Sequence, residues 1–166
     1  MLVKFIINGD PKGQPRPRAF ARRMGSRYVA RVYDSDVADE WKAAVDSTVV
    51  IAAIENRLMQ TKGAIRAAMV FSFARPKSHF TLRGVLKSAM IHDHVCKPDC
   101  DNLAKLVLDR ITRHGAYWRD DSQVVHLTIT KQWAHGSGAS CAVELYGLER
   151  QPDDHPTVAE MPTMAA

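Results

Sequence analysis

Alternating apolar and polar side chains predict the strands of this chain. The alternation is clearest in residues 123–133, where Val125, Leu127 and Ile129 are separated by polar residues. Residues 139–148 follow after a short turn that contains glycine, so we expect these two strands to pair as a β-hairpin. Further strands are predicted at residues 2–8, 28–33 and 64–74.

A helical spacing of apolar side chains predicts two helices. The first begins at an N-cap, Ser35 or Asp36, and continues to about Met59. The second extends from about Asp101 to Arg113 and is closed by a glycine. Strands and helices in this order indicate an α+β fold, a small mixed β-sheet with two main helices.

Two segments show neither periodicity. Residues 9–27 are interrupted by three prolines and three glycines, which predicts a loop. Residues 76–98 form a second irregular connection, and connections longer than about 12–15 residues are commonly functional or mobile.

The composition indicates a globular protein. The 166 residues are 46% hydrophobic and 25% charged, which excludes disorder of the whole chain. No apolar run reaches the ~18 residues of a membrane-spanning helix, and the first residues lack the pattern of a signal peptide. We therefore expect a cytoplasmic protein with no membrane partner and with its three cysteines as reduced thiols. Residues 1–148 are predicted to form one domain, and residues 149–166, which are acidic and contain three prolines, a disordered tail.

Positive charge is concentrated near the start of the chain. The segment from Lys4 to Arg31 contains eight basic residues and a single acidic one, Asp10. Such a segment is either the binding surface for a polyanion or a solvated basic loop that keeps the protein soluble. Prolines within residues 14–18 keep the backbone extended, so arginines there can follow a line of phosphates.

Acidic residues flank the second predicted helix. Asp99 and Asp101 are one residue apart, so in an extended segment both carboxylates face one point. Carboxylate oxygens suit Mg²⁺ or Mn²⁺. Lys105 follows Asp101 by one helical turn, and it either pairs with the acidic residues or presents its ammonium to a phosphate. Asp120 and Asp121 come after the helix, and one of them meets Asp99 and Asp101 if the following strand returns beside the helix start; otherwise they form a polar turn.

Several short motifs add to these acidic residues. Residues 97–105 read Lys-Pro-Asp-x-Asp-Asn-Leu-x-Lys, and residues 118–125 read Trp-x-Asp-Asp-Ser-Gln-Val-Val. Residues 9–18 read Gly-x-Pro-x-Gly-Gln-Pro-Arg-Pro-Arg; Tyr33 and Phe-Ala-Arg-Pro-Lys at residues 73–77 follow. In this order and spacing, the motifs resemble the RusA family of Holliday-junction resolvases, which is common in phages and prophages.

The resemblance implies a RusA-like fold and a homodimer that nicks a four-way DNA junction symmetrically, in recombination and repair, with Mg²⁺ as cofactor and Mn²⁺ as an alternative. The catalytic residues it implies are Asp99, Asp101, Asp121 and Lys105. The metal ligands it implies are Asp99, Asp101 and Asp121, with Asp120 as the neighbouring candidate. The basic residues predicted to contact DNA are Lys12, Arg16, Arg18, Arg22, Arg23, Arg27 and Lys77.

Other interpretations of the same residues stay open. The protein is alternatively a metal nuclease for other branched DNA, such as flaps or forks, or a DNA-binding protein whose acidic cluster is a structural calcium or salt-bridge site. His92, His94, Cys96 and Cys100 are zinc-type ligands, but their spacing is not that of a familiar zinc finger. A polar loop leading to the acidic residues is the favoured interpretation of that segment.

Overall fold

The chain folds around a four-stranded mixed sheet. The computed structural model describes residues 3–15, 18–25, 27–33, 36–88, 93–134 and 138–148. The strand order is β1-β6-β4-β5, and the strands are β1 (Val3–Asn8), β4 (Ala64–Phe73), β5 (Val124–Trp133) and β6 (Ser140–Leu148). Strand β4 pairs in parallel with β5 and antiparallel with β6, which pairs antiparallel with β1.

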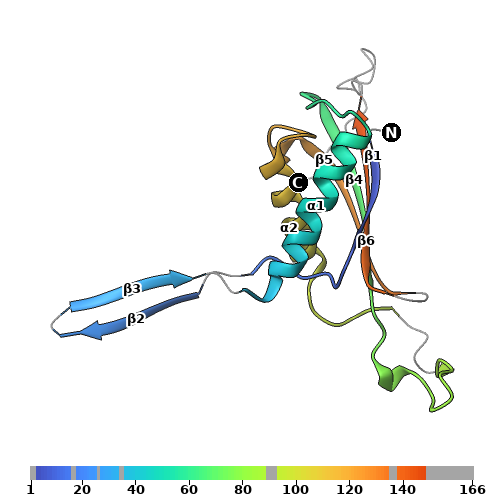
Figure 1. The fold of residues 1–166 in the computed structure, drawn as a ribbon, viewed down its shortest axis with the longest axis horizontal. Helices are drawn as coiled ribbons and strands as arrows, with labels where there is room; N and C mark the ends of the chain where they lie inside the picture. Colours follow the sequence, from blue (N-terminus) through green and yellow to red (C-terminus); the bar gives the residue numbers. More distant parts are fainter. Residues whose placement is uncertain are drawn as a thin grey trace, which may run out of the picture.

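Two helices, α1 (Asp39–Glu55) and α2 (Cys100–His114), pack on one face of this sheet (Figure 1). Alternate residues of β1, β4 and β6 are buried because they point to the helices, whereas the residues between them are more exposed. From the helices, the core receives side chains such as Trp41, Val45 and Leu103. Complete burial of an aliphatic side chain contributes about 1.5–3 kcal/mol, so this layer between helices and sheet holds the domain together.

An ion-pair cluster joins the two helices. Asp46 of α1 accepts hydrogen bonds from Arg110, whose Nε lies 2.6 Å from Asp46 Oδ1. The same Oδ1 lies 3.1 Å from Nε2 of His114. Partial burial raises the pKa of Asp46, but the hydrogen bonds from Arg110 and His114 outweigh this effect and lower the pKa below its usual value. The buried Tyr117 hydroxyl adds a hydrogen bond to the Val49 carbonyl at 2.8 Å.

Helix α2 begins and ends close to the predicted residues. Gly115 has φ 63°, and its N–H bonds to the carbonyls of Ile111 and Thr112, which closes the helix as expected. The first helix differs: a 3₁₀ turn, η1 (Asp36–Ala38), precedes α1, which ends at Glu55 and not near Met59.

Two further sequence predictions were wrong. Strands β5 and β6 do not form a hairpin, because β4 lies between them and pairs with both. The segment 9–27 is not entirely loop, since it contains β2 (Arg18–Met24). Strand β2 pairs antiparallel with β3 (Arg27–Tyr33) in a separate two-stranded sheet. Figure 1 shows this ribbon projecting away from the body.

Four further sequence predictions concern the connection after β4, the cysteines, membrane-spanning helices and the C-terminal tail. The irregular connection after β4 contains only short elements among its described residues, such as the 3₁₀ turn η2 (Lys77–His79). Cys96, Cys100 and Cys141 are free thiols. No helix in the described part of the chain is long and apolar enough to cross a membrane. The predicted tail at 149–166 lies outside the described residues.

Candidate active site

The acidic pair Asp99 and Asp101 lies at the start of α2. Asp99 is the N-cap residue and has extended backbone angles, yet its side chain makes no capping hydrogen bond. Both side chains are exposed, and neither has a hydrogen bond or ion pair within the described ranges. The positive end of the helix dipole favours negative charge at this place. Two carboxylates are therefore kept accessible and unpaired.

Contacts from distant strands and loops position this pair. Lys131 of β5 donates from Nζ to the carbonyls of Cys96 at 2.6 Å and Pro98 at 2.9 Å. The N–H of Gln14 donates to the carbonyl of Asn102 at 3.1 Å. Gly13 approaches Asn102 so closely that a Cβ at residue 13 would lie 2.4 Å from its Nδ2. These contacts fix the segment on both sides of Asp99, and sequence analysis missed the role of Lys131.

His94 anchors the same segment to the sheet. Its ring stacks on Phe73 at 4.1 Å between centroids and meets the edge of Trp133 at 4.4 Å. Burial and the nearby charge of Lys131 lower the pKa of His94 below its usual value, which favours a neutral ring. Of the other candidate zinc ligands, Cys96 is exposed, Cys100 is half-buried at the start of α2, and His92 lies outside the described residues.

Lys105 is exposed one turn into α2. Its Nζ lies 3.7 Å from Asp109, at the next turn of the helix, and not beside Asp101. This contact is too exposed to hold the ammonium firmly, because such surface pairs contribute roughly 0–1 kcal/mol. Lys105 is consequently free to turn toward an anion at the helix start.

Asp120 and Asp121 differ in their structural roles. Asp120 caps the 3₁₀ turn η4 (Asp121–Gln123): its side chain accepts from the N–H of Ser122 at 2.9 Å, and the Gln123 side chain completes the capping box. These hydrogen bonds lower the pKa of Asp120. Asp121 is half-buried and makes no such bond within the described part of the chain. Asp121 is therefore the freer carboxylate of the two.

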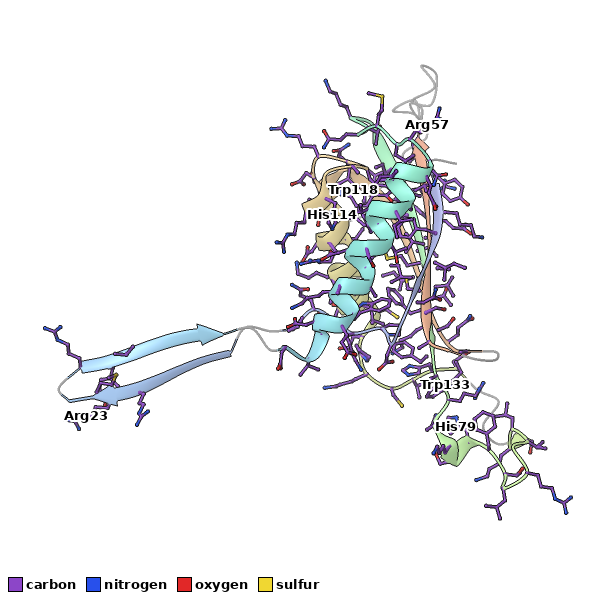
Figure 2. The ribbon with its side chains drawn as sticks, viewed as in Figure 1. Arg23, Arg57, His79, His114, Trp118 and Trp133 are labelled. Carbon is purple, nitrogen blue, oxygen red and sulfur yellow. The ribbon has the colours of Figure 1, made fainter. Side chains whose placement is uncertain are left out.

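The two acidic segments lie at opposite ends of α2. From Asp101 to His114 the helix is about 20 Å long, at about 1.5 Å per residue. Asp121 lies beyond its far end, where the Trp118 indole N–H bonds to Thr112 at 2.8 Å. Figure 2 shows Trp118 and His114 toward one end of the body and Trp133 toward the other. The predicted meeting of Asp120 or Asp121 with the acidic pair does not occur within one chain. Among the described residues, no three His, Cys, Asp or Glu side chains are close enough to hold one metal ion.

The predicted DNA contacts fall in three regions. Lys12 lies before β2 and forms an ion pair with Asp10. Lys77 is exposed at the start of η2. The exposed arginines of β2 and β3 are Arg22, Arg23 and Arg27. Arg16 and the side chain of Arg18 fall outside what the structure describes.

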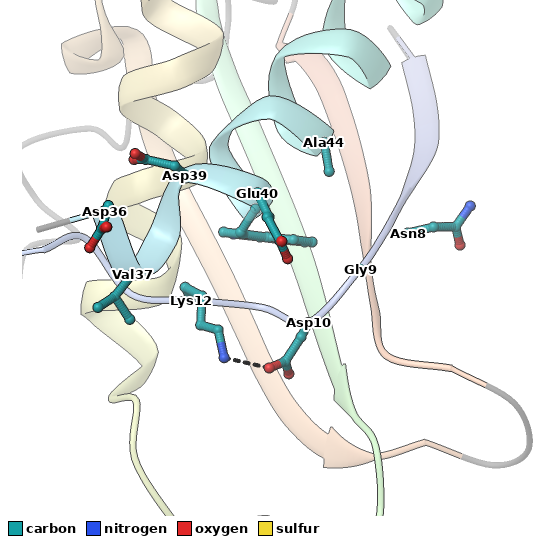
Figure 3. Close-up of a pocket in the computed structure, with 10 residues that line it drawn as sticks. Asn8, Gly9, Asp10, Lys12, Asp36, Val37, Asp39, Glu40 and Ala44 are labelled. Atoms are coloured by element: carbon teal, nitrogen blue, oxygen red, sulfur yellow. Dashed lines mark hydrogen bonds and ion pairs between the residues drawn. The ribbon is translucent and has the colours of Figure 1, made fainter.

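A separate cavity of about 540 Å³ lies at the start of α1 (Figure 3). Its acidic lining residues are Asp10, Asp36, Asp39 and Glu40. Two of these have partners, since Asp10 pairs with Lys12 and Asp39 accepts from Lys42 at 2.9 Å. The cavity contains none of the predicted catalytic residues, so we do not include it in the candidate site.

The residues at the start of α2 fit a divalent cation. Exposed, unpaired carboxylates supply the oxygen ligands that Mg²⁺ prefers, and Mg²⁺ commonly binds through one or two carboxylates while it keeps several waters. Asp99 and Asp101 of a single chain would supply only part of such a ligand set, and Lys105 lies one turn further along α2, near Asp109.

Comparison with known proteins agrees with the motifs. The sequence model of one family, Endodeoxyribonuclease RusA, matches residues 8–144. The match covers the acidic pair, the second acidic segment, both helices and the whole of β4 and β5. No curated protein matches the chain. The chain therefore belongs to the RusA family of endodeoxyribonucleases, which act on branched DNA junctions.

Proposed function

We propose that this protein is a Mg²⁺-dependent resolvase that nicks four-way DNA junctions in pairs during recombination and repair. The observation that carries the proposal is the pair of accessible, unpaired carboxylates, Asp99 and Asp101, with Lys105 one turn away. The alternative cation, Mn²⁺, prefers the same oxygen ligands.

In this proposal the residues of the chain hold the cation, neutralise charge on the scissile phosphate and bind the flanking phosphates of the DNA. Asp99 and Asp101 hold the cation, which when bound lowers the pKa of a water and polarises the phosphate. Lys105 leaves Asp109 and turns toward the scissile phosphate, where its charge offsets the negative charge that develops in the transition state. Exposed basic residues such as Lys77 hold flanking phosphates, so affinity falls with salt.

We further propose that the protein acts as a homodimer with an active site shared between protomers. In the described part of the chain, Asp121 does not join Asp99 and Asp101 in a group that could hold one ion, because α2, which is about 20 Å long, lies between the two acidic segments. Carboxylates that share one metal ion bind it at about 2.0–2.1 Å each, so this distance excludes a common ion within one chain. Asp121 of the partner subunit is the carboxylate that can complete the site.

The edge strand β5 offers a contact for such a dimer. It pairs only with β4, and its outer edge has no backbone partner in the described part of the chain. Residues 124–130 carry no Asp, Glu, Lys or Arg, and Val125 is 63% exposed. A long uncharged edge strand favours pairing with another strand. If the β5 strands of two protomers pair antiparallel about a two-fold axis near their middle, the start of one β5 lies beside the end of the other. Asp121 precedes the start of β5, and Lys131 near its end contacts the segment before Asp99. This pairing would therefore bring the second acidic segment of one protomer toward the acidic pair of the other.

The edge contact has its own test. The double variant Thr128→Lys, Thr130→Lys places like charges along the edge, and we expect it to sediment as a monomer while Thr128→Ser, Thr130→Ser sediments as the wild type does. A dimer of unchanged strength in the lysine variant would exclude the β5 edge.

Nicking of a synthetic four-way junction, with Mg²⁺ or with EDTA, tests the proposed function. We expect Asp99→Asn and Asp101→Asn to abolish nicking and to retain junction binding, because each loses a ligand and some repulsion against phosphate. Asp93→Asn is the matched control, since Asp93 is an exposed aspartate in the same connecting segment. Binding by the wild type without nicking would favour a DNA-binding protein, and equal nicking of flaps or forks would favour a broader nuclease.

A further inference from the structure

In the described part of the chain, the ribbon formed by β2 and β3 pairs with no other strand. Each strand has seven residues and the two pair only with each other. An isolated two-stranded ribbon is marginally stable in water. At the tip, Met24 and Tyr28 are 64% and 75% exposed. These features indicate a surface that binds another molecule.

The charge of the ribbon indicates the kind of molecule. Residues 18–33 include five arginines and no lysine, aspartate or glutamate. The register places Arg22 opposite Val29 and Arg23 opposite Tyr28, so arginines occupy both faces. Arginine is also common in protein interfaces, but five arginines with no acidic residue among them give the ribbon a strong positive charge. A ribbon with arginine on both faces therefore fits a polyanion that surrounds it.

The width and reach of the ribbon fit duplex DNA. The major groove admits a two-stranded β-ribbon, whose edges then lie between two rows of phosphates. Arg22, Arg23 and Arg27 are exposed along the outer half, around the apolar tip. Guanidinium groups can bind the phosphates while Met24 and Tyr28 contact base edges.

The segment that leads into the ribbon contacts the candidate active site. Gln14, four residues before β2, bonds to Asn102 at the start of α2. From Arg18, the seven residues of β2 extend about 24 Å, at about 3.4 Å per residue. One duplex step is about 3.4 Å, so the tip reaches phosphates about seven base pairs from the scissile phosphate.

We propose that the β2–β3 ribbon is an arm that grips one duplex arm of the junction in its groove, about half a turn or more from the cut. This inference rests on the proposed function and adds the part of the substrate that the ribbon binds. The arm makes affinity depend on the length of the duplex arms, whereas the acidic pair and Lys105 act only at the scissile phosphate.

The test measures binding in EDTA, so that its outcome does not depend on cleavage. The variant Arg22→Gln, Arg23→Gln, Arg27→Gln is compared with the wild type on junctions whose duplex arms have about 20 or about 4 base pairs, the short ones closed by hairpin loops. On long arms we expect the variant to bind at least about tenfold more weakly and its salt slope to fall by roughly two to three units, about 0.9 per lost phosphate contact. On short arms we expect the two proteins to bind almost equally.

Arg83→Gln is the control for loss of charge alone, because Arg83 is exposed on a different loop. Equal weakening on short and long arms, an unchanged salt slope, or the same effect per charge from Arg83→Gln would overturn the proposal. So would a change in the sedimentation of the DNA-free variant, because the ribbon would then hold a second copy of the chain. If the affinity of the wild type depended on the length of the duplex arms but the wild type never nicked with Mg²⁺, the ribbon's role in DNA binding would be supported and the proposed function refuted.

Discussion

Mixing two inactive variants tests whether one active site draws residues from two chains. Asp101→Asn and Asp121→Asn are each expected to be inactive alone, because each homodimer lacks one carboxylate in both sites. In a shared site, the mixed dimer has one site with both changes and one site with neither. In a site built from one chain, both sites of the mixed dimer stay defective.

The expected magnitude follows from the dimer's symmetry. Random exchange of protomers at equal concentrations makes about half of the dimers mixed, and each mixed dimer has one intact site of two. About a quarter of all sites are then active, so single-turnover nicking should recover to about one quarter of the wild-type amplitude, from near zero for either variant alone. The helix length between Asp101 and His114, about 20 Å, is the reason we expect recovery.

The assay is nicking of a labelled junction after the two variants have been mixed, partly unfolded in urea and refolded together. Refolding each variant alone is the first control. Mixing Asp101→Asn with Asp99→Asn is the second, because both changes affect the same acidic pair and no mixed site is intact in that case. No recovery in the first mixture, with exchange shown by two affinity tags, would refute the shared site and require Asp121 to act elsewhere.

Three other changes test single side chains. Lys105→Ala should slow single-turnover nicking by about 10²-fold or more while junction affinity changes little, because the ammonium acts on transition-state charge; equal losses of rate and affinity would make it a phosphate anchor. Lys131→Met removes the hydrogen bonds to the carbonyls of Cys96 and Pro98, which position the segment before Asp99. We expect the Mg²⁺ concentration for half-maximal nicking to rise by about tenfold or more, as it does when residues that orient metal ligands are changed. Junction binding in EDTA should not change. Asp46→Asn should lower the free energy of unfolding by about 1–3 kcal/mol at pH 7; because the folded-state pKa of Asp46 is lowered, urea unfolding should show the full difference above about pH 4 and a loss of it as pH falls through the folded value.

Local sequence signals were sufficient for most of the elements. The end of α2 was predictable because a glycine with positive φ follows His114 and closes the helix by bonds to its own last turn. The α+β class follows from such local patterns. Strand β3 of the ribbon was predicted at residues 28–33. Strand β2 was missed because its arginines and alanines give little apolar alternation, and the prolines nearby indicate loop.

Partners of strands and side chains were not predictable in the same way. Alternation shows that β5 and β6 are strands, but not which strand lies between them; β4, with alternate residues buried, takes the central place. Lys131 is 33 residues from Pro98 in sequence, so no local pattern marks their contact. For the same reason the sequence did not show whether the chain after α2 returns to the start of that helix, so it was expected that Asp121 would meet Asp99.

The separation of the acidic segments has a consequence for the proposed reaction. A protomer that carries Asp99 and Asp101 at one end of α2 and Asp121 at the other cannot assemble the full set of carboxylates alone. Cleavage would then require the dimer, and a two-fold dimer places two identical sites in a fixed relation. The two ribbons of such a dimer would be related by the same axis, so each would grip a duplex arm about half a turn or more from its own cut. A junction nicked in only one of its two symmetric strands would then indicate loss of one active site, not loss of DNA binding. The mixed dimer of Asp101→Asn and Asp121→Asn, which keeps one intact site, should therefore make single nicks and bind the junction with normal affinity.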